Sequence, residues 1–457
     1  MEQLPSLMLG LSHLIPSANI LHFLSIINGI YSISSGGVTQ LNISRYCSIS
    51  YRTVQRFMSL DIPWHQLLIL MLREHLSDYT GVYLLAIDET VEDKAGKSTD
   101  KIGYFFSSKL GKVIKSVSFG VLSLIPVGKR KSYVVDFTQL SQDTAKTADN
   151  KAKKELSAQK KKDKAAGITV ESAPSGRPVG SKNKVKTKVD TQSSLTLTLL
   201  LTRVLPFLAS ILIHPSYLVG DGAYGNLTYC LIAAEHNLAL ISKLNCTTAL
   251  FYPPKKGTGQ RIYGDKVDFS QLDAHKIHEK EEHECIFTFF QIKKIRTRTI
   301  GQLINVVIIR CYHKKSKKTG FVLLFSTDLA LEGMTLVDYY SLRFQIEFNF
   351  RDAKQHFGLS DFKSTKPTQI KNAVGLSFFM VNLSAILIQN IKEQCHFEFL
   401  SILDLKACFR AVLFSKHLKN TPVLNLTNIL EPENRSILTH LGVVNMFNNH
   451  NVDRKAA

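Results

Sequence analysis

Three acidic residues stand where carboxylates can meet a metal ion. Asp88 closes the apolar segment "VYLLAID" (82–88), and Asp221 follows the apolar stretch "YLVG" (217–220). Loops at the carboxyl ends of strands place ligands in open α/β sheets. Glu347 lies on the polar side of a predicted helix. Converging carboxylates repel one another unless a divalent cation neutralises them, and all-oxygen ligation suits Mg²⁺ or Mn²⁺.

Such a site would support phosphoryl transfer. Two ions about 3.5–4 Å apart can activate an attacking oxygen and stabilise the leaving oxygen of an in-line displacement. The alternative is that each acid only caps a turn, which is the usual role of a single acid at a strand end. Three acids in this arrangement favour a site.

The stretch "YYSLRFQIEFNFRDAKQHFG" (339–358) predicts one helix with a polar face. At about 100° per residue, Tyr340, Arg343, Glu347 and Lys354 fall within an arc of about 60°. Arginine offers a planar fork for phosphate, and lysine a mobile point charge. The alternative is a solvated stripe with an i,i+4 ion pair worth a few tenths of a kcal/mol.

The elements that must position these residues indicate a mixed α/β fold. After the strand at 82–88, the segments "IGYFFS", "KVIKSVSFGVLSLI" and "SYVVDF" predict a β-meander. A helix at 195–213, the strand before Asp221, a helix from Asn226 and a strand at 238–243 predict an alternating α/β unit. Residues 245–330 read as mostly β, and "INVVIIRCYH" and "FVLLFST" are the clearest strands.

The N-terminal region has the pattern of a helix-turn-helix. The stretch 37–58 predicts a helix from Thr39 to Tyr46, a turn at Cys47 to Ser50 and a second helix through Phe57. The second helix carries polar side chains that can reach phosphates and base edges. Short helix pairs are also ordinary packing units. The candidate DNA-contacting residues are Ser50, Arg52, Thr53, Gln55 and Arg56.

Residues 142–194 are a basic insertion. Between Lys146 and Lys188 there are 13 Lys or Arg and four acids, with almost no large apolar residue, so the segment cannot form a core. Within it, "GRPVGSKNK" (176–184) resembles an AT-hook, in which Arg177 and Lys182 would enter a narrow A·T minor groove. A plain basic linker is the alternative.

Composition favours nucleic acid as the partner. The 457-residue chain has a formal net charge of +20 and a pI near 9.5, so its field attracts polyanions. An anionic membrane surface is the second possibility. The long apolar stretches 195–213 and 373–388 contain Arg203, Pro206 and Asn382, which favours buried core helices over membrane spans. The N-terminus lacks the pattern of a signal peptide, so we expect a cytoplasmic, nucleoid-associated protein.

Other chemistries find little support in the sequence. Seven scattered cysteines include no C-x-x-C pair, which argues against a disulfide framework or zinc knuckle. The segment "HKIHEKEEHEC" (275–285) has no recognised zinc spacing and reads as a solvated polar stretch. Neither a P-loop nor a dinucleotide-binding motif is present, so ATP and NAD chemistry are unsupported.

The spacing of the polar residues in 339–358 is similar to the signature of a known family. The chain resembles the DDE transposases of bacterial insertion sequences of the IS-four type, whose helix signature is Tyr, two residues, Arg, three residues, Glu, six residues, Lys. Tyr340, Arg343, Glu347 and Lys354 match it without a gap. The resemblance implies a ribonuclease H-like core in which Asp88, Asp221 and Glu347 form the DDE triad and bind two Mg²⁺ ions, with Mn²⁺ as a substitute.

The resemblance also implies an activity and partners. These are cleavage of double-stranded DNA at the inverted repeats of an element, strand transfer into target DNA, and a homodimer in the synaptic complex. Tyr340, Arg343 and Lys354 would contact phosphates of the element's ends. Relatives can stack a flipped base on a tryptophan of the β insertion, but the only tryptophan here is Trp64, so Phe251 or Tyr252 would have to substitute.

We therefore expect an α/β protein divided into seven segments, and two rivals to the transposase. One rival is a transposase-derived DNA-binding regulator without chemistry, and the other is a structure-specific nuclease on the same core. The expected segments are 1–75 (helical, DNA-binding), 80–141, 195–244 and 331–392 (three parts of the core), 142–194 (basic insertion), 245–330 (β-rich insertion) and 393–457 (helical).

Overall fold

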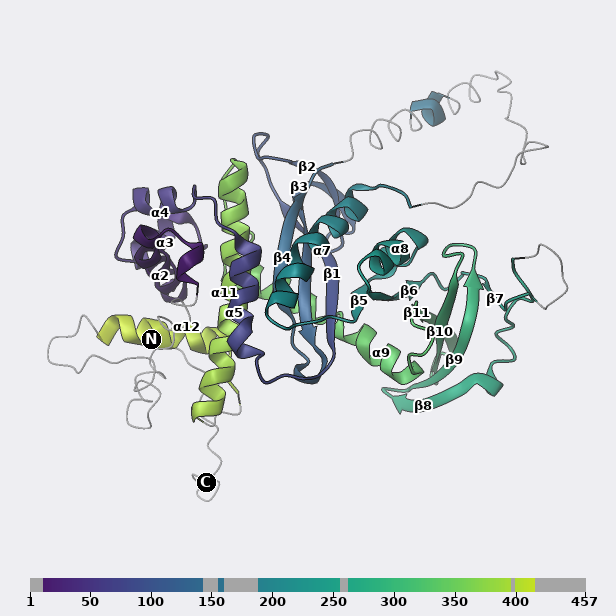
Figure 1. Cartoon of the computed structure of the whole chain (residues 1–457). Coiled ribbons are helices and arrows are strands. Elements are labelled where there is room, and N and C mark those ends of the chain that lie inside the picture. Colours follow the sequence, from purple (N-terminus) through teal and green to yellow (C-terminus); the bar gives the residue numbers. More distant parts are fainter. Residues whose placement is uncertain (1–10, 143–154, 160–187, 255–261, 396–398, 416–457) are drawn as a thin grey trace.

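A mixed β-sheet lies at the centre of the protein. The computed structural model describes residues 11–142, 155–159, 188–254, 262–395 and 399–415 (Figure 1). Five strands of the sheet lie in the order β4, β3, β1, β5, β6, with β3 antiparallel to β4 and β1, and β5 parallel to β1 and β6. This is a ribonuclease H-like core, which confirms the predicted fold class. Their bounds are Tyr83–Asp93 (β1), Lys112–Pro126 (β3), Tyr133–Leu140 (β4), Tyr217–Gly220 (β5) and Ala239–Leu244 (β6).

The strand that carries Asp88 is longer than the sequence predicts. Its pairing with β5 ends at Ile87, opposite Gly220, but its antiparallel pairing with β3 continues to Asp93. The prediction that Asp88 closes a strand is therefore wrong. The apolar run at 82–88 covers the part of β1 that pairs with both β3 and β5. The more polar residues after it pair with β3 only.

Two helices join the strands of the core. α7 (Gln192–Ser210) connects β4 to β5 and packs on β3 and β4, and α8 (Leu227–Glu235) connects β5 to β6. α7 begins with a capping box, since Thr191 and Ser194 each accept a hydrogen bond from the other's backbone N–H. Both helix starts thus lie at the end of the sheet near Asp221.

The β-rich segment continues the core sheet. β11 (Lys318–Ser326) runs antiparallel to β6, and the sheet then proceeds through β10 (Leu303–His313) and β9 (Cys285–Thr297). β7 (Leu250–Phe251) and β8 (Lys276–Glu282) pair with β9. The polar stretch from His275 forms β8, whose side chains are all exposed, as expected for a solvated segment.

Helices from both ends of the chain pack together beside β4 (Figure 1). α11 (Pro367–Cys395) covers this edge strand, since the Asn382 side chain accepts from the Val134 N–H at 3.0 Å and donates to its carbonyl at 2.7 Å. α5 (Trp64–His75) lies against both. The indole Nε1 of the buried Trp64 donates to Asn372 Oδ1 at 2.8 Å, so this residue links α5 to α11.

The predicted helix pair of the N-terminal region is present. α3 (Gln40–Tyr46) is capped by Thr39 and α4 (Tyr51–Phe57) by Ser50, each side chain accepting a backbone N–H of the first turn. Both helices pack on α2 (Ser17–Ser32), and α2 also contacts α12 (Ile402–Ser415).

The signature segment forms two helices instead of the predicted single one. α9 (Gly333–Leu342) and α10 (Gln345–His356) are joined by Arg343 and Phe344. Around the junction the backbone N–H groups bond three residues back, for example Arg343 to Tyr340 and Glu347 to Phe344. Such bonds tighten the chain to about three residues per turn. The junction contains no Gly or Pro, so tertiary contacts at Arg343 account for it better than local propensity.

Two described helices are long and apolar enough to span a bilayer by length and composition, namely α7 and α11. The expectation of buried core helices holds for α11, which lies mostly inside the protein. It holds for only one side of α7, because Leu195 and Leu199 are about half exposed.

Candidate active site

Asp88 and Asp221 lie side by side on neighbouring parallel strands. The last residues paired between β1 and β5 are Ile87 and Gly220, and the two acids come next. Asp221 caps the short 3₁₀ turn Gly222–Tyr224, where its Oδ1 accepts the Ala223 N–H at 2.9 Å. Asp88 Oδ1 accepts the Glu89 N–H at 2.8 Å. The adjacent register brings together two carboxylates that are far apart in the chain.

Arg343 connects the third acid to this pair. Its Nη1 lies 3.2 Å from Asp88 Oδ2, and its Nη2 lies 3.1 Å from Glu347 Oε1. The Arg343 side chain is only 14% exposed, and its Nε is buried without a hydrogen-bond partner among the described residues. The junction between α9 and α10 thus places one cation between two of the three predicted catalytic acids.

Electrostatic interactions show that the three acids share one environment. The pKa of Asp88 is raised to about 6, mainly by burial and to a smaller extent by the nearby carboxylates of Asp221 and Glu347. The Glu89 N–H and Arg343 act in the opposite direction, because both stabilise the carboxylate. Crowded acids with a raised pKa are typical of sites that bind a cation.

The donor chemistry of this site fits a divalent metal. Asp88, Asp221 and Glu347 offer only oxygen ligands, which Mg²⁺ and Mn²⁺ prefer. In this conformation, no three His, Cys, Asp or Glu side chains of the described residues are close enough to hold an ion. Because the Arg343 guanidinium already bridges two of the acids, it stands in for a bound cation.

The other two signature residues have different surroundings. Tyr340 lies beside the acids, with the Arg343 guanidinium 5.9 Å from its ring centroid. Lys354 instead pairs with the buried Glu92 at 2.8 Å and donates to the Val91 carbonyl at 3.3 Å. Its ammonium therefore neutralises a buried acid of β1, which the prediction of a phosphate contact did not include.

Of the four remaining candidate DNA-binding residues, the structure describes two. Arg52 and Arg56 are exposed and one helical turn apart on α4. Arg177 and Lys182 of the AT-hook-like segment lie outside the described residues.

Sequence reasoning missed two acids of β1. Glu92 is 4% exposed and accepts a hydrogen bond from Ser360 at 2.6 Å in addition to its pairing with Lys354. Glu89 accepts a hydrogen bond from Ser193 of α7 at 2.7 Å. The only signal available was the density of acids in "DETVED" (88–93). Because the strand was predicted to end at Asp88, the acids after it were not assigned to the strand or to the site.

The fold and the clustered acids define a class of enzyme that transfers phosphoryl groups at a carboxylate site. The family model described as "DDE superfamily endonuclease" matches residues 32–299, more than half of the chain. The protein therefore belongs to the DDE superfamily endonucleases, a family of DNA-cleaving enzymes whose domains typically use divalent metals. The match includes Asp88 and Asp221 and ends before Glu347. A search of curated proteins finds no match to this chain.

Proposed function

We propose that this protein is a DNA transposase of the IS-four type, which cleaves DNA at the ends of its element and joins those ends to target DNA. The observation that carries the proposal is the meeting of Asp88, Arg343 and Glu347, with Asp221 beside them, in a chain of the DDE family. The signature spacing of the α9 and α10 segment supports the finer assignment.

In this proposal each residue has a separate task. Asp88, Asp221 and Glu347 hold the divalent ions, which when bound supply the charge that activates the attacking oxygen and stabilises the leaving one. Arg343 moves from the carboxylates to a phosphate of the DNA end, to which its fork can donate two hydrogen bonds. Tyr340 donates one hydrogen bond to the same strand or stacks on a base.

The rest of the proposal concerns the whole protein. The helix-turn-helix with Arg52 and Arg56 would bind the terminal repeats, and the basic insertion would add contacts to DNA of any sequence. We further propose a homodimer that holds two element ends, the seven-segment division given above, and a place of action on the bacterial chromosome.

The test is cleavage of DNA that carries the gene's own flanking sequences. Wild-type protein with Mg²⁺ or Mn²⁺ should cut at matching inverted ends and join them to a target plasmid. Asp88→Asn, Asp221→Asn and Glu347→Gln should each abolish cleavage and leave end binding largely intact, because each removes a metal ligand without changing the side chain's size. Full cleavage by any one variant would remove that residue from the site.

Two outcomes would favour the rivals. Cutting of DNA that lacks the ends, without strand transfer, would indicate a structure-specific nuclease. Tight end binding without cutting, under the same metal conditions, would indicate a retained DNA-binding regulator. The Arg351→Ala variant serves as the control, because this exposed arginine of α10 pairs with Asp352 and not with the three acids.

A further inference from the structure

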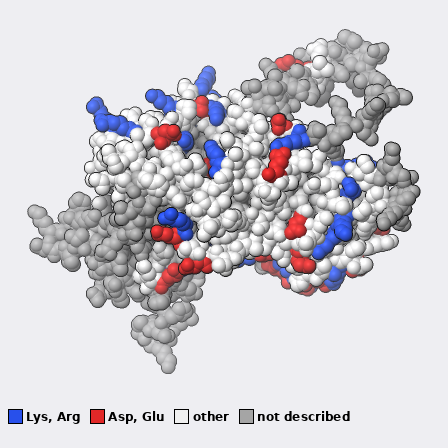
Figure 2. Space-filling model, viewed as in Figure 1, with Lys and Arg blue, Asp and Glu red and all other residues white. Residues whose placement is uncertain are grey.

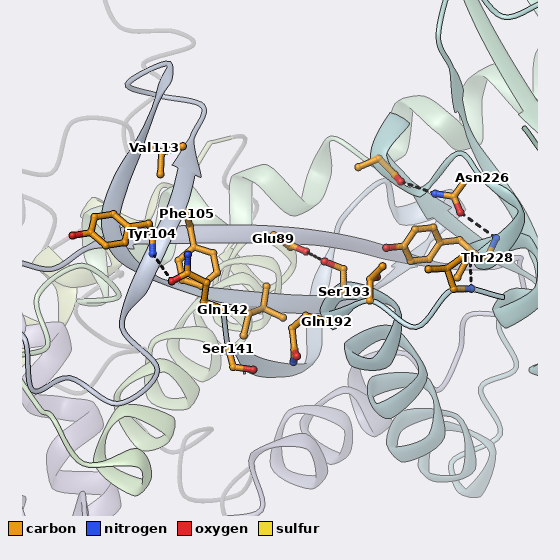
Figure 3. Close-up of a pocket in the computed structure, with 15 residues that line it drawn as sticks. Glu89, Tyr104, Phe105, Val113, Ser141, Gln142, Gln192, Ser193, Asn226 and Thr228 are labelled. Atoms are coloured by element: carbon orange, nitrogen blue, oxygen red, sulfur yellow. Dashed lines mark hydrogen bonds between the residues drawn. The ribbon is translucent and has the colours of Figure 1, made fainter. Parts of the chain in front are cut away.

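A cavity lies beside the candidate active site and has no role in the chemistry described above. Its volume is about 750 Å³, within the range of small-ligand pockets. Figure 3 shows it between β2 (Gly103–Ser107), the end of β4 and the first turns of α7 and α8. Glu89 lies in its middle, Phe105 at one side and Asn226 at the other.

This cavity adjoins the catalytic acids directly. Glu89 follows Asp88 on β1, and because side chains of a strand alternate between faces, it points to the opposite side of the sheet. Ala223, whose N–H bonds the Asp221 carboxylate at 2.9 Å, is one of the lining residues. Ala223 therefore brings one edge of the cavity beside the Asp221 carboxylate.

Among the described residues, the lining contains no lysine or arginine. Glu89 is the only charged side chain of the described lining, and it is accessible through the cavity although protein atoms surround it. A carboxylate without a neighbouring cation repels phosphate, so this cavity is unsuited to the DNA backbone. A single acid is also too few ligands for a metal ion of its own.

The lining instead has the chemistry that recognises a nucleobase. Phe105 is half-buried and Tyr229 is 7% exposed, and aromatic rings of this kind stack on bases. Gln142, Gln192 and Asn226 contribute amides. Glu89 Oε1 accepts from Ser193, and no described residue donates to Oε2, which leaves this oxygen as an acceptor for a ligand.

We propose that this cavity binds one unpaired base of the DNA strand held at Asp221, and that it prefers a base with an exocyclic amino group, such as cytosine. The Glu89 carboxylate accepts from the amine, as acids accept from cytosine N4 in base recognition, and Phe105 stacks on the ring. The inference rests on the proposed function only in that it takes DNA as the substrate.

The test compares two single-stranded probes, dC12 and dU12. Their bases differ only in that uracil has a carbonyl oxygen in place of the amino group of cytosine and carries a proton on N3. Binding is measured by fluorescence anisotropy without divalent metal, so that no cleavage occurs. Wild-type protein should bind dC12 at least about fivefold more tightly than dU12. Glu89→Gln should reduce this ratio to below about twofold, because glutamine can satisfy either base.

The ratio of affinities is the deciding quantity. Removing the Glu89 charge strengthens the binding of any polyanion, and this effect is common to both probes and cancels in the ratio. An equal affinity of wild-type protein for dC12 and dU12 would overturn the proposal, as would an unchanged ratio in Glu89→Gln.

A matched pair of phenylalanine variants tests the stacking. Phe105→Ala should weaken binding of both probes about tenfold. Phe106→Ala, on the same strand but outside the cavity and 61% exposed, should leave both affinities unchanged. Equal effects of the two variants would contradict a role for Phe105. Thermal unfolding checks that Phe105→Ala is folded, and Phe105→Leu, which keeps the bulk but not the aromatic face, should also lose affinity.

Failure of this inference is distinguishable from failure of the proposed function. A protein that cleaves and joins element ends but does not distinguish dC12 from dU12 is a transposase without this base site. A protein that distinguishes the probes but cuts no DNA has the base site without the proposed activity.

Discussion

Arg343 is a counterion of Asp88 and Glu347, two of the three proposed catalytic acids, in this structure. It is paired to Asp88 and Glu347 and nearly buried, which is a different state from the phosphate contact that the sequence predicts. The ion pairs and the phosphate contact are compatible if the guanidinium leaves the two carboxylates when it binds a phosphate of DNA. A cation that already bridges two carboxylates competes with any metal for them, so metal binding and release of Arg343 are linked.

Arg343→Ala should therefore bind Mn²⁺ more tightly than wild type in the absence of DNA. We expect about a tenfold increase at pH 8, because the metal no longer displaces a guanidinium. The measurement is titration of free Mn²⁺ by electron paramagnetic resonance. Arg351→Ala is the matched control and should leave Mn²⁺ affinity unchanged. If Arg343→Ala also left it unchanged, the competition would be ruled out.

Lys354 has a structural role that any test of DNA contact must take into account. Lys354→Ala leaves the buried Glu92 without its cation, and we expect a loss of about 1–3 kcal/mol in the free energy of unfolding. We expect a loss in the lower part of this range, because Lys354 is 34% exposed and water screens its charge. The measurement is denaturant unfolding.

The double variant Glu92→Gln with Lys354→Ala separates stability from DNA binding. It should recover most of the stability, because glutamine can still bond Ser360 without a buried charge. If Lys354 also contacts phosphate, the double variant still shows weaker end binding and a flatter salt dependence. Wild-type binding by this stable variant would assign Lys354 to the fold alone.

At the scale of elements, α5 carries a titratable group near each end. Burial lowers the pKa of both His65 and His75 to about 4, helped by Arg203 and Lys371 at the first and by Lys129 at the second. His75 Nε2 also lies 2.7 Å from the Tyr133 hydroxyl of β4. Both imidazoles are therefore neutral where the helix meets its neighbours.

Acid should weaken the packing of α5. An exposed histidine has a pKa near 6.5, so between pH 6.5 and 4 the unfolded chain binds protons that the folded chain does not. The free energy of unfolding should fall as the pH falls through this window, by at most about 1.4 kcal/mol per pH unit for each histidine. Denaturant unfolding from pH 7 to 4.5 measures it.

The variant His65→Gln with His75→Gln should show a shallower dependence on pH than wild type. His283→Gln is the control, because this side chain is 93% exposed, and it should leave the dependence unchanged. Parallel curves for wild type and the double variant would show that these histidines do not carry the effect.

At the scale of the whole molecule, positive charge is unevenly distributed along the chain. On the face shown in Figure 2, the Lys and Arg side chains of the described residues are scattered among Asp and Glu and form no continuous stripe. The sequence between Lys146 and Lys188 has 13 Lys or Arg and four acids, a net of +9. Much of the attraction for DNA should therefore come from this insertion.

Replacing residues 143–187 with a short Gly-Ser linker should flatten the salt dependence of DNA binding. Removal of one phosphate contact reduces the slope of log K against log salt by about 0.9, so the removal of several should be visible as a change of a few units. A shuffled insertion of the same composition should keep the slope. If it also keeps any preference for A·T-rich DNA, Arg177 and Lys182 do not act as an AT-hook. An unchanged slope after replacement would show that the insertion does not contact DNA.

Local patterns in the sequence predicted most strands of the sheet and the N-terminal helix pair, and they singled out the three acids of the proposed site. Apolar runs predicted β1, β3, β4, β5, β10 and β11, and cap residues such as Ser50 marked the helix pair. These signals are local, because strand alternation and capping depend on neighbours within a few residues. The family signature singled out Glu347 for the same reason, since its spacing lies within one stretch of chain.

Only the tertiary structure decided what these residues contact. The ion pairs of Arg343 with Asp88 and of Lys354 with Glu92 join the signature segment to β1, and no local pattern encodes a pairing between residues so far apart. The extension of β1 to Asp93 depends on its partner β3. The cavity around Glu89 depends on strands and helices that meet only in the folded chain. The sequence by itself thus determined which side chains are present and on which elements, whereas packing determined which charges face one another.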